Sequence, residues 1–284
     1  MLGGSEMKNM IIYYFSGTGN TWWIANVLQQ QLTAQKHQVE CYSIETLTME
    51  NVLEQVKDAD HIILGFPVYG STAPNIMLNF IHQFPSTTNG QSVSIFATQA
   101  LASGDTAYHI GQMLIEKGYN LKQTMHLRMM NNFHIPKFRF YRPKNDYHVD
   151  KLHQKSLPKV EKLALAITND EKHIIGKNIL ARLLGNLQRS HIDKAIDTVS
   201  KEFKIDTTRC INCGKCERIC PTQNIKKCNC TYKFKDNCIL CLRCYSQCPK
   251  SAILIGEGTK NEVKYPRYKG PEKYFSIIEK NLKK

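Results

Sequence analysis

The chain has no apolar run close to the length needed to cross a bilayer, although 42% of its 284 residues are hydrophobic. It also shows no apolar stretch typical of a secretory signal, so we expect a reducing, cytoplasmic environment. Its histidines lack the spacing of metal ligands, and we expect them to be structural or on the surface. No nucleic-acid-binding motif accompanies its basic residues. These absences argue against an integral membrane protein, a secreted disulfide scaffold and a nucleic-acid-binding protein.

Eight of the eleven cysteines, in contrast, form one pattern that occurs twice. The first copy is Cys210-Ile-Asn-Cys213-Gly-Lys-Cys216-Glu-Arg-Ile-Cys220-Pro221, and the second is Cys238-Ile-Leu-Cys241-Leu-Arg-Cys244-Tyr-Ser-Gln-Cys248-Pro249. Each copy reads C-x2-C-x2-C-x3-C-P, a bacterial iron–sulfur run in which the fourth cysteine serves the other cluster. We therefore expect two 4Fe-4S clusters with crossed ligand sets. These sets are Cys210, Cys213, Cys216 and Cys248 for one cluster, and Cys238, Cys241, Cys244 and Cys220 for the other.

Two other interpretations of these cysteines stay open at this point. Zinc sites usually combine two cysteine pairs, or one pair with histidines, and do not call for a third cysteine two residues further on. A disulfide framework is typical of short secreted chains. The spacing favours iron–sulfur clusters over both, and Cys228 and Cys230 are surplus to the eight ligands.

The N-terminal part contains a loop suited to a phosphate group. Residues 8–15 form an apolar run of strand length, and residues 22–32 have helical character. Between them lie Ser16, Gly17, Thr18, Gly19, Asn20 and Thr21. Backbone N–H groups at a helix N-terminus attract anions, but the loop lacks the Lys-Ser/Thr of a Walker A motif and the third glycine of a dinucleotide fingerprint. Hydroxyls and an amide without a neighbouring cation suit a phosphate monoester.

The same alternation continues along the next hundred residues. Residues 39–43, 61–66, 92–98 and 121–129 are predicted strands, and residues 75–84 and 106–117 are predicted helices. Alternating strands and helices favour a doubly wound parallel sheet, with a ligand beyond the carboxyl ends of its strands. The loops after the first, third and fourth strands should therefore meet at one edge of the sheet.

Residues 8–130 resemble a flavodoxin, and residues 16–21 resemble its FMN phosphate loop. The resemblance implies that Pro67, Val68, Tyr69 and Gly70 flank the isoalloxazine, with Tyr69 as the stacking ring and Gly70 permitting a peptide flip. A structural role for Tyr69 at the sheet edge is the alternative. Thr98, Gly104 and Asp105 occupy the place of the third flavin loop. The cysteine segment resembles a small two-cluster ferredoxin, and the whole chain resembles bacterial fusions of these two families.

The resemblance implies an α/β, flavodoxin-like, doubly wound parallel sheet followed by a small α+β domain of the bacterial two-cluster ferredoxin type. We expect the first domain at residues 7–170, a helical linker at 171–203, the cluster domain at 204–256 and a tail at 257–284. The tail should contain a short helix at residues 272–282 that packs back on the first domain. Residues 131–146 have no clear period and are expected to form a functional loop.

The net charge of +14 is unevenly distributed. Residues 1–120 carry four basic and nine acidic residues, whereas residues 121–205 carry seventeen and eight, and residues 206–284 carry seventeen and seven. A basic middle and tail can be a solvated surface or a docking surface for an acidic redox partner protein. Nucleic acid is the least favoured partner.

The resulting prediction is an electron-transfer protein that passes electrons between FMN, two 4Fe-4S clusters and an external redox partner. The alternative is an FMN-dependent reductase of a small acceptor, supplied with electrons by its own clusters. Such a reductase needs an open flavin face and a proton donor, for which Tyr69, Ser103 and His134 are candidates. No catalytic acid, base or nucleophile stands out, so the sequence leaves open whether the chain is an enzyme.

Overall fold

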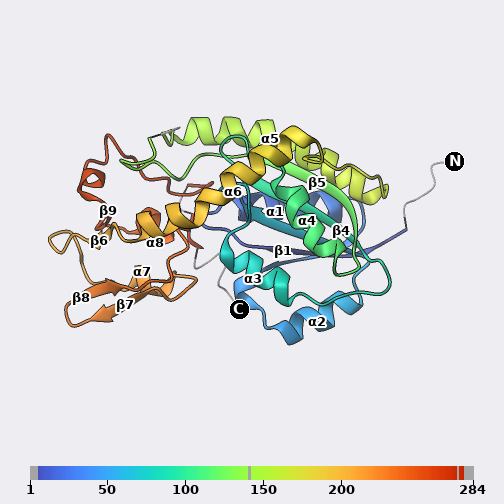
Figure 1. Ribbon diagram of the computed structural model, residues 1–284, viewed down its shortest axis with the longest axis horizontal. Helices are drawn as coiled ribbons and strands as arrows, with labels where there is room; N and C mark the ends of the chain where they lie inside the picture. Colours follow the sequence, from blue (N-terminus) through green and yellow to red (C-terminus); the bar gives the residue numbers. More distant parts are fainter. Residues whose placement is uncertain (1–5, 140–141, 274, 278–284) are drawn as a thin grey trace.

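The N-terminal part is a parallel sheet with helices on both faces (Figure 1). The computed structural model describes residues 6–139, 142–273 and 275–277. The elements of this part are β1 (Asn9–Tyr14), α1 (Asn20–Ala34), β2 (Gln38–Ser43), α2 (Met49–Lys57), β3 (His61–Pro67), α3 (Asn75–Gln83), β4 (Ser92–Gln99), α4 (Thr106–Ile115), β5 (Asn120–Arg128) and α5 (Asp146–Thr168). The strand order is β2-β1-β3-β4-β5, and every neighbouring pair is parallel. This order confirms the predicted doubly wound sheet, with its switch point between β1 and β3.

Side chains of β1 alternate between the two faces of the sheet, as a period of two requires. Ile11 and Tyr13 belong to one core, which α2, α3 and α4 cover. Met10 and Ile12 belong to the other core, which α1 and α5 cover. Because both faces are buried, β3 is almost continuously apolar, and its burial explains why its sequence shows no alternation.

The cysteine segment folds as two similar halves. After α6 (Ile179–Ser200), it contains β6 (Phe203–Ile205), α7 (Lys215–Arg218), β7 (Ile225–Cys228), β8 (Thr231–Phe234), α8 (Arg243–Gln247), β9 (Ile253–Ile255) and the 3-10 turn η2 (Glu257–Lys260). Strands β6 and β9 pair antiparallel, as do β7 and β8. Each four-cysteine motif therefore carries one short helix between two strands. This arrangement confirms the predicted small α+β fold.

Segments outside these two units join them. Ile135, from the irregular segment after β5, is fully buried in the core of the cysteine segment. Phe275 and Ile277 are buried beside α1, where the ring of Phe275 lies 5.3 Å from that of Trp22. The tail thus packs back on the first domain, whereas most of the helix predicted at residues 272–282 lies outside the described residues. None of the described helices combines the length and apolar character that crossing a bilayer would need.

Candidate functional site

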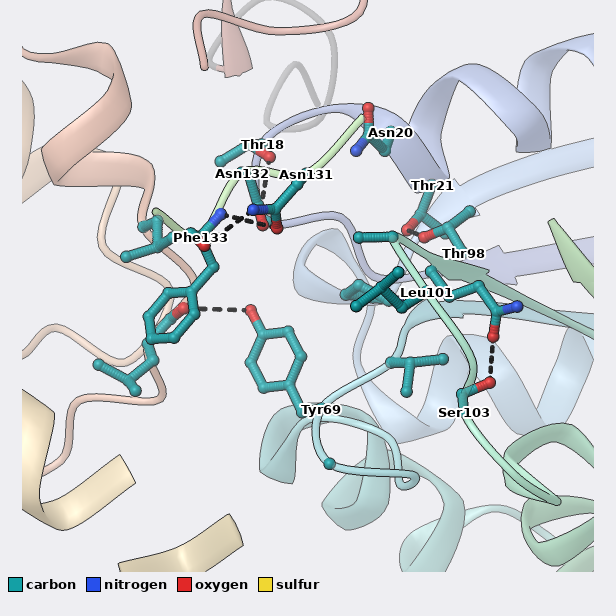
Figure 2. A pocket seen from close by; sticks show the side chains of 18 of the residues that line it. Thr18, Asn20, Thr21, Tyr69, Thr98, Leu101, Ser103, Asn131, Asn132 and Phe133 are labelled. Atoms are coloured by element: carbon teal, nitrogen blue, oxygen red, sulfur yellow. Dashed lines mark hydrogen bonds between the residues drawn. The ribbon is translucent and has the colours of Figure 1, made fainter. Parts of the chain in front are cut away.

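The loop at residues 16–21 connects β1 to α1 and is held by buried hydrogen bonds. The Ser16 hydroxyl accepts a hydrogen bond from the Gly19 N–H at 3.1 Å, and Thr21 Oγ1 lies 2.8 Å from Thr98 Oγ1 on β4. Thr18 Oγ1 accepts a hydrogen bond from the Asn132 side chain at 2.8 Å (Figure 2). The loop therefore has a fixed conformation before any ligand contact is considered.

The N-terminus of α1 is open to an anion. Its N-cap residue, Gly19, has φ +106° and forms no side-chain cap, and the first turn of the helix contains no acidic residue. The uncapped N–H groups and the positive end of the helix dipole favour a phosphate group. A Cβ atom on Gly19 would lie 2.4 Å from Pro271 of the tail, so the close packing of the tail also requires glycine here.

The loop after β3 places Tyr69 beside the cysteine segment. The backbones of Tyr69 and Thr72 exchange hydrogen bonds across a tight turn, in which Gly70 and Ser71 have φ +55° and +61°. Figure 2 shows the Tyr69 hydroxyl directed at the main chain of the neighbouring segment, where it donates to Leu240 O at 3.3 Å. Burial raises the pKa of Tyr69 well above its usual value, so the hydroxyl keeps its proton and remains a donor.

The loop after β4 divides into two parts. Thr98 and the segment up to Ser103 face the same space as Tyr69. Gly104 and Asp105 instead lie against α6: a Cβ on Gly104 would approach the Gly185 nitrogen to 2.6 Å, and Asp105 pairs with Arg189 at 2.6 Å. These two predicted flavin residues therefore fasten α6 to the loop and do not line the cavity.

The three loops surround one cavity of about 440 Å³, which we call the large cavity. Its volume lies within the range of cofactor sites. Of the predicted flavin residues, Ser16, Gly17, Thr18, Asn20, Thr21, Pro67, Val68, Tyr69, Gly70 and Thr98 line it, whereas Gly19 faces the tail. An uncapped helix N-terminus at one end and a largely apolar slot with an aromatic ring at the other fit a phosphate and a flavin ring respectively, as FMN binding requires.

Sequence reasoning missed a large share of this lining. The irregular segment contributes Asn131, Asn132 and Phe133, α6 contributes Gln188, Ile192 and Ile196, and the second cysteine motif contributes Leu240 and Leu242. A Cβ on Gly70 would lie 2.7 Å from the Ile192 side chain, which shows how closely α6 covers the loop. The segment predicted as a linker is thus also a wall of the cavity. Its helical spacing alone could not reveal which face would be used.

The eight motif cysteines line two further cavities, four in each. Cys210, Cys213, Cys216 and Cys248 line the first, which we call the outer cysteine cavity. Cys220, Cys238, Cys241 and Cys244 line the second, the inner cysteine cavity. These are the two crossed sets expected from the sequence. Within the described residues, no three His, Cys, Asp or Glu side chains converge as a single metal ion would require. Four thiols around a space fit a cubane.

Apolar contacts and backbone donors complete these cavities. Ile225 lines the inner cavity, and Ala252 and Ile253 line the outer one, where their apolar side chains would cover the clusters. The fourth cysteine of each motif accepts a hydrogen bond from the N–H four residues later, at 3.2 Å in both Cys220 and Cys248. Burial raises the pKa of Cys241 to about 12, which the neighbouring Arg243 partly offsets. N–H donors and a nearby cation stabilise the thiolate form that iron binding needs.

Arg243 joins the phosphate loop to the inner cysteine cavity. Its guanidinium is fully buried and donates to Ser16 O at 2.8 Å and to Gly17 O at 3.2 Å. It also forms a two-point ion pair with Glu45, and Nη1 lies 2.7 Å from Glu45 Oε1. The phosphate loop contains no cation of its own, as its sequence indicates. The tertiary structure brings one to its backbone from 226 residues away.

Comparisons with known proteins agree with this arrangement. Residues 11–139 match the family model of a flavodoxin domain. Residues 203–226 and 235–258 match two family models of 4Fe-4S binding domains. The flavodoxin domain implies FMN, and the two 4Fe-4S domains imply two clusters, so the combination points to electron transfer.

Individual relatives match mainly the first domain. A diflavin flavoprotein of Thermosynechococcus vestitus is 32% identical over 119 residues, which are 41% of this chain and 20% of that protein. The chain thus spans about a fifth of the length of this relative. Flavodoxin 2 from Bacillus cereus is 21% identical, with a TM-score of 0.42, over 57% of this chain and 98% of its own. The two-electron reduced flavodoxin of Megasphaera elsdenii is 25% identical, with a TM-score of 0.37, over 44% and 90%. The strand order and the family matches agree on a flavodoxin domain followed by a segment that carries two 4Fe-4S binding domains.

Proposed function

We propose that this protein transfers electrons internally between FMN in the large cavity and the 4Fe-4S clusters, and externally to a redox partner protein. The observation that carries the proposal is the shared wall between the two sites. Leu242 lines both the large cavity and the inner cysteine cavity, and Leu240 lines the large cavity between two cluster ligands. When bound, FMN exchanges one or two electrons and each cube exchanges one.

The contact between the two sites is close and depends on glycine. A Cβ on Gly17 would lie 2.7 Å from Cys241 O, so the backbone of the phosphate loop touches the backbone of the second cysteine motif. Tyr69 adds its hydrogen bond to Leu240 O, and Arg243 adds its two bonds to the loop carbonyls. These residues hold the walls of the large cavity and the inner cysteine cavity in direct contact.

The outer cysteine cavity supports an exit toward a partner. Cys213 is exposed, and the adjoining Ile211 is 55% exposed. An apolar residue and a cluster ligand at the surface suit a transient docking contact, for which basic residues around it supply long-range attraction to an acidic partner. We propose that the outer cluster faces the external redox protein and the inner cluster faces FMN.

Rapid mixing tests the internal step. The anaerobically purified protein, loaded with FMN and clusters, is mixed with a limiting one-electron reductant, and flavin and cluster absorbance are followed. Redistribution of electrons between them should be first order and independent of protein concentration. The Cys213→Ser variant is a matched control, because its cluster lies away from the large cavity. A redistribution rate proportional to protein concentration would show transfer between molecules and overturn the proposal.

A flavin-dependent reductase is the second candidate, favoured by the size of the large cavity. Ser103 lines this cavity and contacts His126 at 3.3 Å, whereas His134 does not line it. Burial lowers the pKa of His126 to about 4, so the imidazole is neutral and positions Ser103 without supplying a proton at neutral pH. Steady-state turnover with quinones or nitro compounds discriminates the candidates, since a carrier reacts with protein acceptors alone.

We propose cytoplasmic residence, because eight motif thiols must stay reduced to bind iron. The boundaries 7–170, 171–203, 204–256 and 257–284 serve as proposed domain limits. The packing of α6 over the large cavity and of the tail against α1 supports expressing the chain whole.

A further inference from the structure

A second hollow adjoins the large cavity and is surrounded by positive charge. It has a volume of about 210 Å³, and six basic residues line it: Arg128, Arg142, Lys144, His148, Lys151 and Lys155. We call it the cationic pocket. Among the residues that the structure describes, no acidic one lines it, although residues 121–205 contain eight. Within the described ranges, none of the six basic residues forms an ion pair with an acidic side chain.

These six residues, five of them arginines or lysines, come together from three elements of the fold. Arg128 ends β5, Arg142 and Lys144 belong to the segment before α5, and the other three lie on α5 at positions i, i+3 and i+7. This spacing places them on one face of the helix. Arg142 donates a hydrogen bond to Val263 O, and His148 Nδ1 lies 2.6 Å from Asn145 Oδ1. Two of the six are therefore positioned by neighbouring groups.

The acidic side chains nearest in sequence are directed elsewhere. Asp146 interacts electrostatically with the buried Tyr268, and Asp150 interacts with His153. Asp146 and Asp150 are four residues apart and so share one face of α5. This face differs from the one that carries His148, Lys151 and Lys155. Cations gathered without a counter-charge repel each other, which costs stability that a bound anion would restore. The pocket is concave, and its basic residues come from three elements of the fold. Both features favour a small anionic group over a broad acidic protein surface.

The floor of the pocket connects it to the large cavity. Ala100, Met130 and Asn131 line both, and the floor is completed by apolar groups such as the buried Met129. A ligand held by its anionic end would have its remaining part directed along this wall toward the site assigned to FMN. We propose that the cationic pocket binds the phosphate or diphosphate group of a small organic phosphate.

Calorimetric titration of the FMN- and cluster-loaded protein tests this proposal, with inorganic pyrophosphate, ADP and adenosine as probes. Pyrophosphate and ADP should bind saturably with one site per chain, and the neutral adenosine should not. The double variant Lys151→Ala/Lys155→Ala should weaken their binding by on the order of tenfold, since it removes two charge-assisted contacts. Lys159→Ala/Lys162→Ala, on the same helix outside the pocket, is the matched control and should change binding less than about twofold.

Three results would overturn the proposal. These are absence of saturable binding at low ionic strength, equal loss in both double variants, and binding of an acidic protein alone through Lys151 and Lys155. If ADP binds no more tightly than pyrophosphate, the pocket recognises the free anion alone. This result would reject the proposal that the ligand is an organic phosphate. The proposal relies on the proposed flavin site only for the direction of the ligand. Because heat and not electron flow is measured, its failure leaves the electron-transfer proposal intact.

Discussion

Replacing Arg243 should separate the flavin and cluster sites. The Arg243 side chain is 1% exposed and that of its partner Glu45 is 7% exposed. Burial lowers the pKa of the Arg243 guanidinium, but the Glu45 carboxylate and nearby groups raise it by more. The net pKa is above its usual value, so the guanidinium stays charged at all ordinary pH. Arg243→Met keeps the apolar stem but leaves the Glu45 carboxylate buried without its partner. It also removes the donors to Ser16 O and Gly17 O.

The magnitude follows from the burial of the pair. Removing one partner of a buried ion pair costs about 3–5 kcal/mol. If the contact between the domains bears this loss, the equilibrium constant for opening this contact rises by about a thousandfold. This conversion uses about 1.4 kcal/mol per factor of ten. The double variant Glu45→Gln/Arg243→Met removes the isolated charge and loses mainly hydrogen bonds to carbonyls, worth about 1 kcal/mol each. The contact between the domains should therefore open at least tenfold less readily in the double variant than in Arg243→Met.

Hydrogen exchange of the FMN- and cluster-loaded protein measures this opening. The amide of Ser246, which donates to Leu242 O at 2.8 Å, and the amides of residues 16–19 should exchange faster by about a hundredfold to a thousandfold in Arg243→Met. Arg267→Met is the matched control. Arg267 is also buried, but it donates to Tyr245 O and Ser251 O inside the cysteine segment. Its loss should leave residues 16–19 protected.

Two results would refute this reasoning. Exchange at residues 16–19 that changes less than about threefold in Arg243→Met would show that the ion pair does not hold the domains together. Equal acceleration in Arg267→Met would show that the cysteine segment loosens as a whole. Redistribution of electrons between FMN and clusters should slow in Arg243→Met and recover in part in the double variant.

Three other predictions concern single features of the site. Gly70→Ala should weaken FMN binding, because the residue has φ +55° and a Cβ would meet Ile192; fluorescence titration against Gly90→Ala, where no atom lies within 4 Å, checks it. Cys220→Ser should abolish the electron paramagnetic signal of the inner cluster and spare the outer one, and loss of the outer signal would contradict the crossed assignment. Burial lowers the pKa of His126 to about 4 from its usual 6.5, so the unfolded chain takes up the proton first and stability should fall from pH 6.5 toward pH 4. Thermal melts of the wild type and of His126→Gln should converge at the acid end.

The sequence was most informative where local chemistry is strict. Cysteine spacing predicted both ligand sets, because a cubane fixes the distances between its thiolates. A strand, a glycine-rich loop and a helix in succession predicted the phosphate loop, since only a helix N-terminus presents free N–H groups in this way. The short helix α2 was not predicted, although Thr48 and Asn51 form a capping box at its start. Its nine residues are too few for a clear helical period.

Residue patterns by themselves predicted the doubly wound sheet, the phosphate loop and the eight cysteine ligands, and the resemblance to flavodoxins added the FMN assignment. The tertiary structure alone decided that Gly104 and Asp105 anchor α6, that α6 covers the large cavity, and that Arg243 reaches the phosphate loop. These features depend on contacts between residues far apart in the chain, and no local pattern encodes such contacts. The same holds for the cationic pocket, because its basic residues come from three elements that only the tertiary structure brings together.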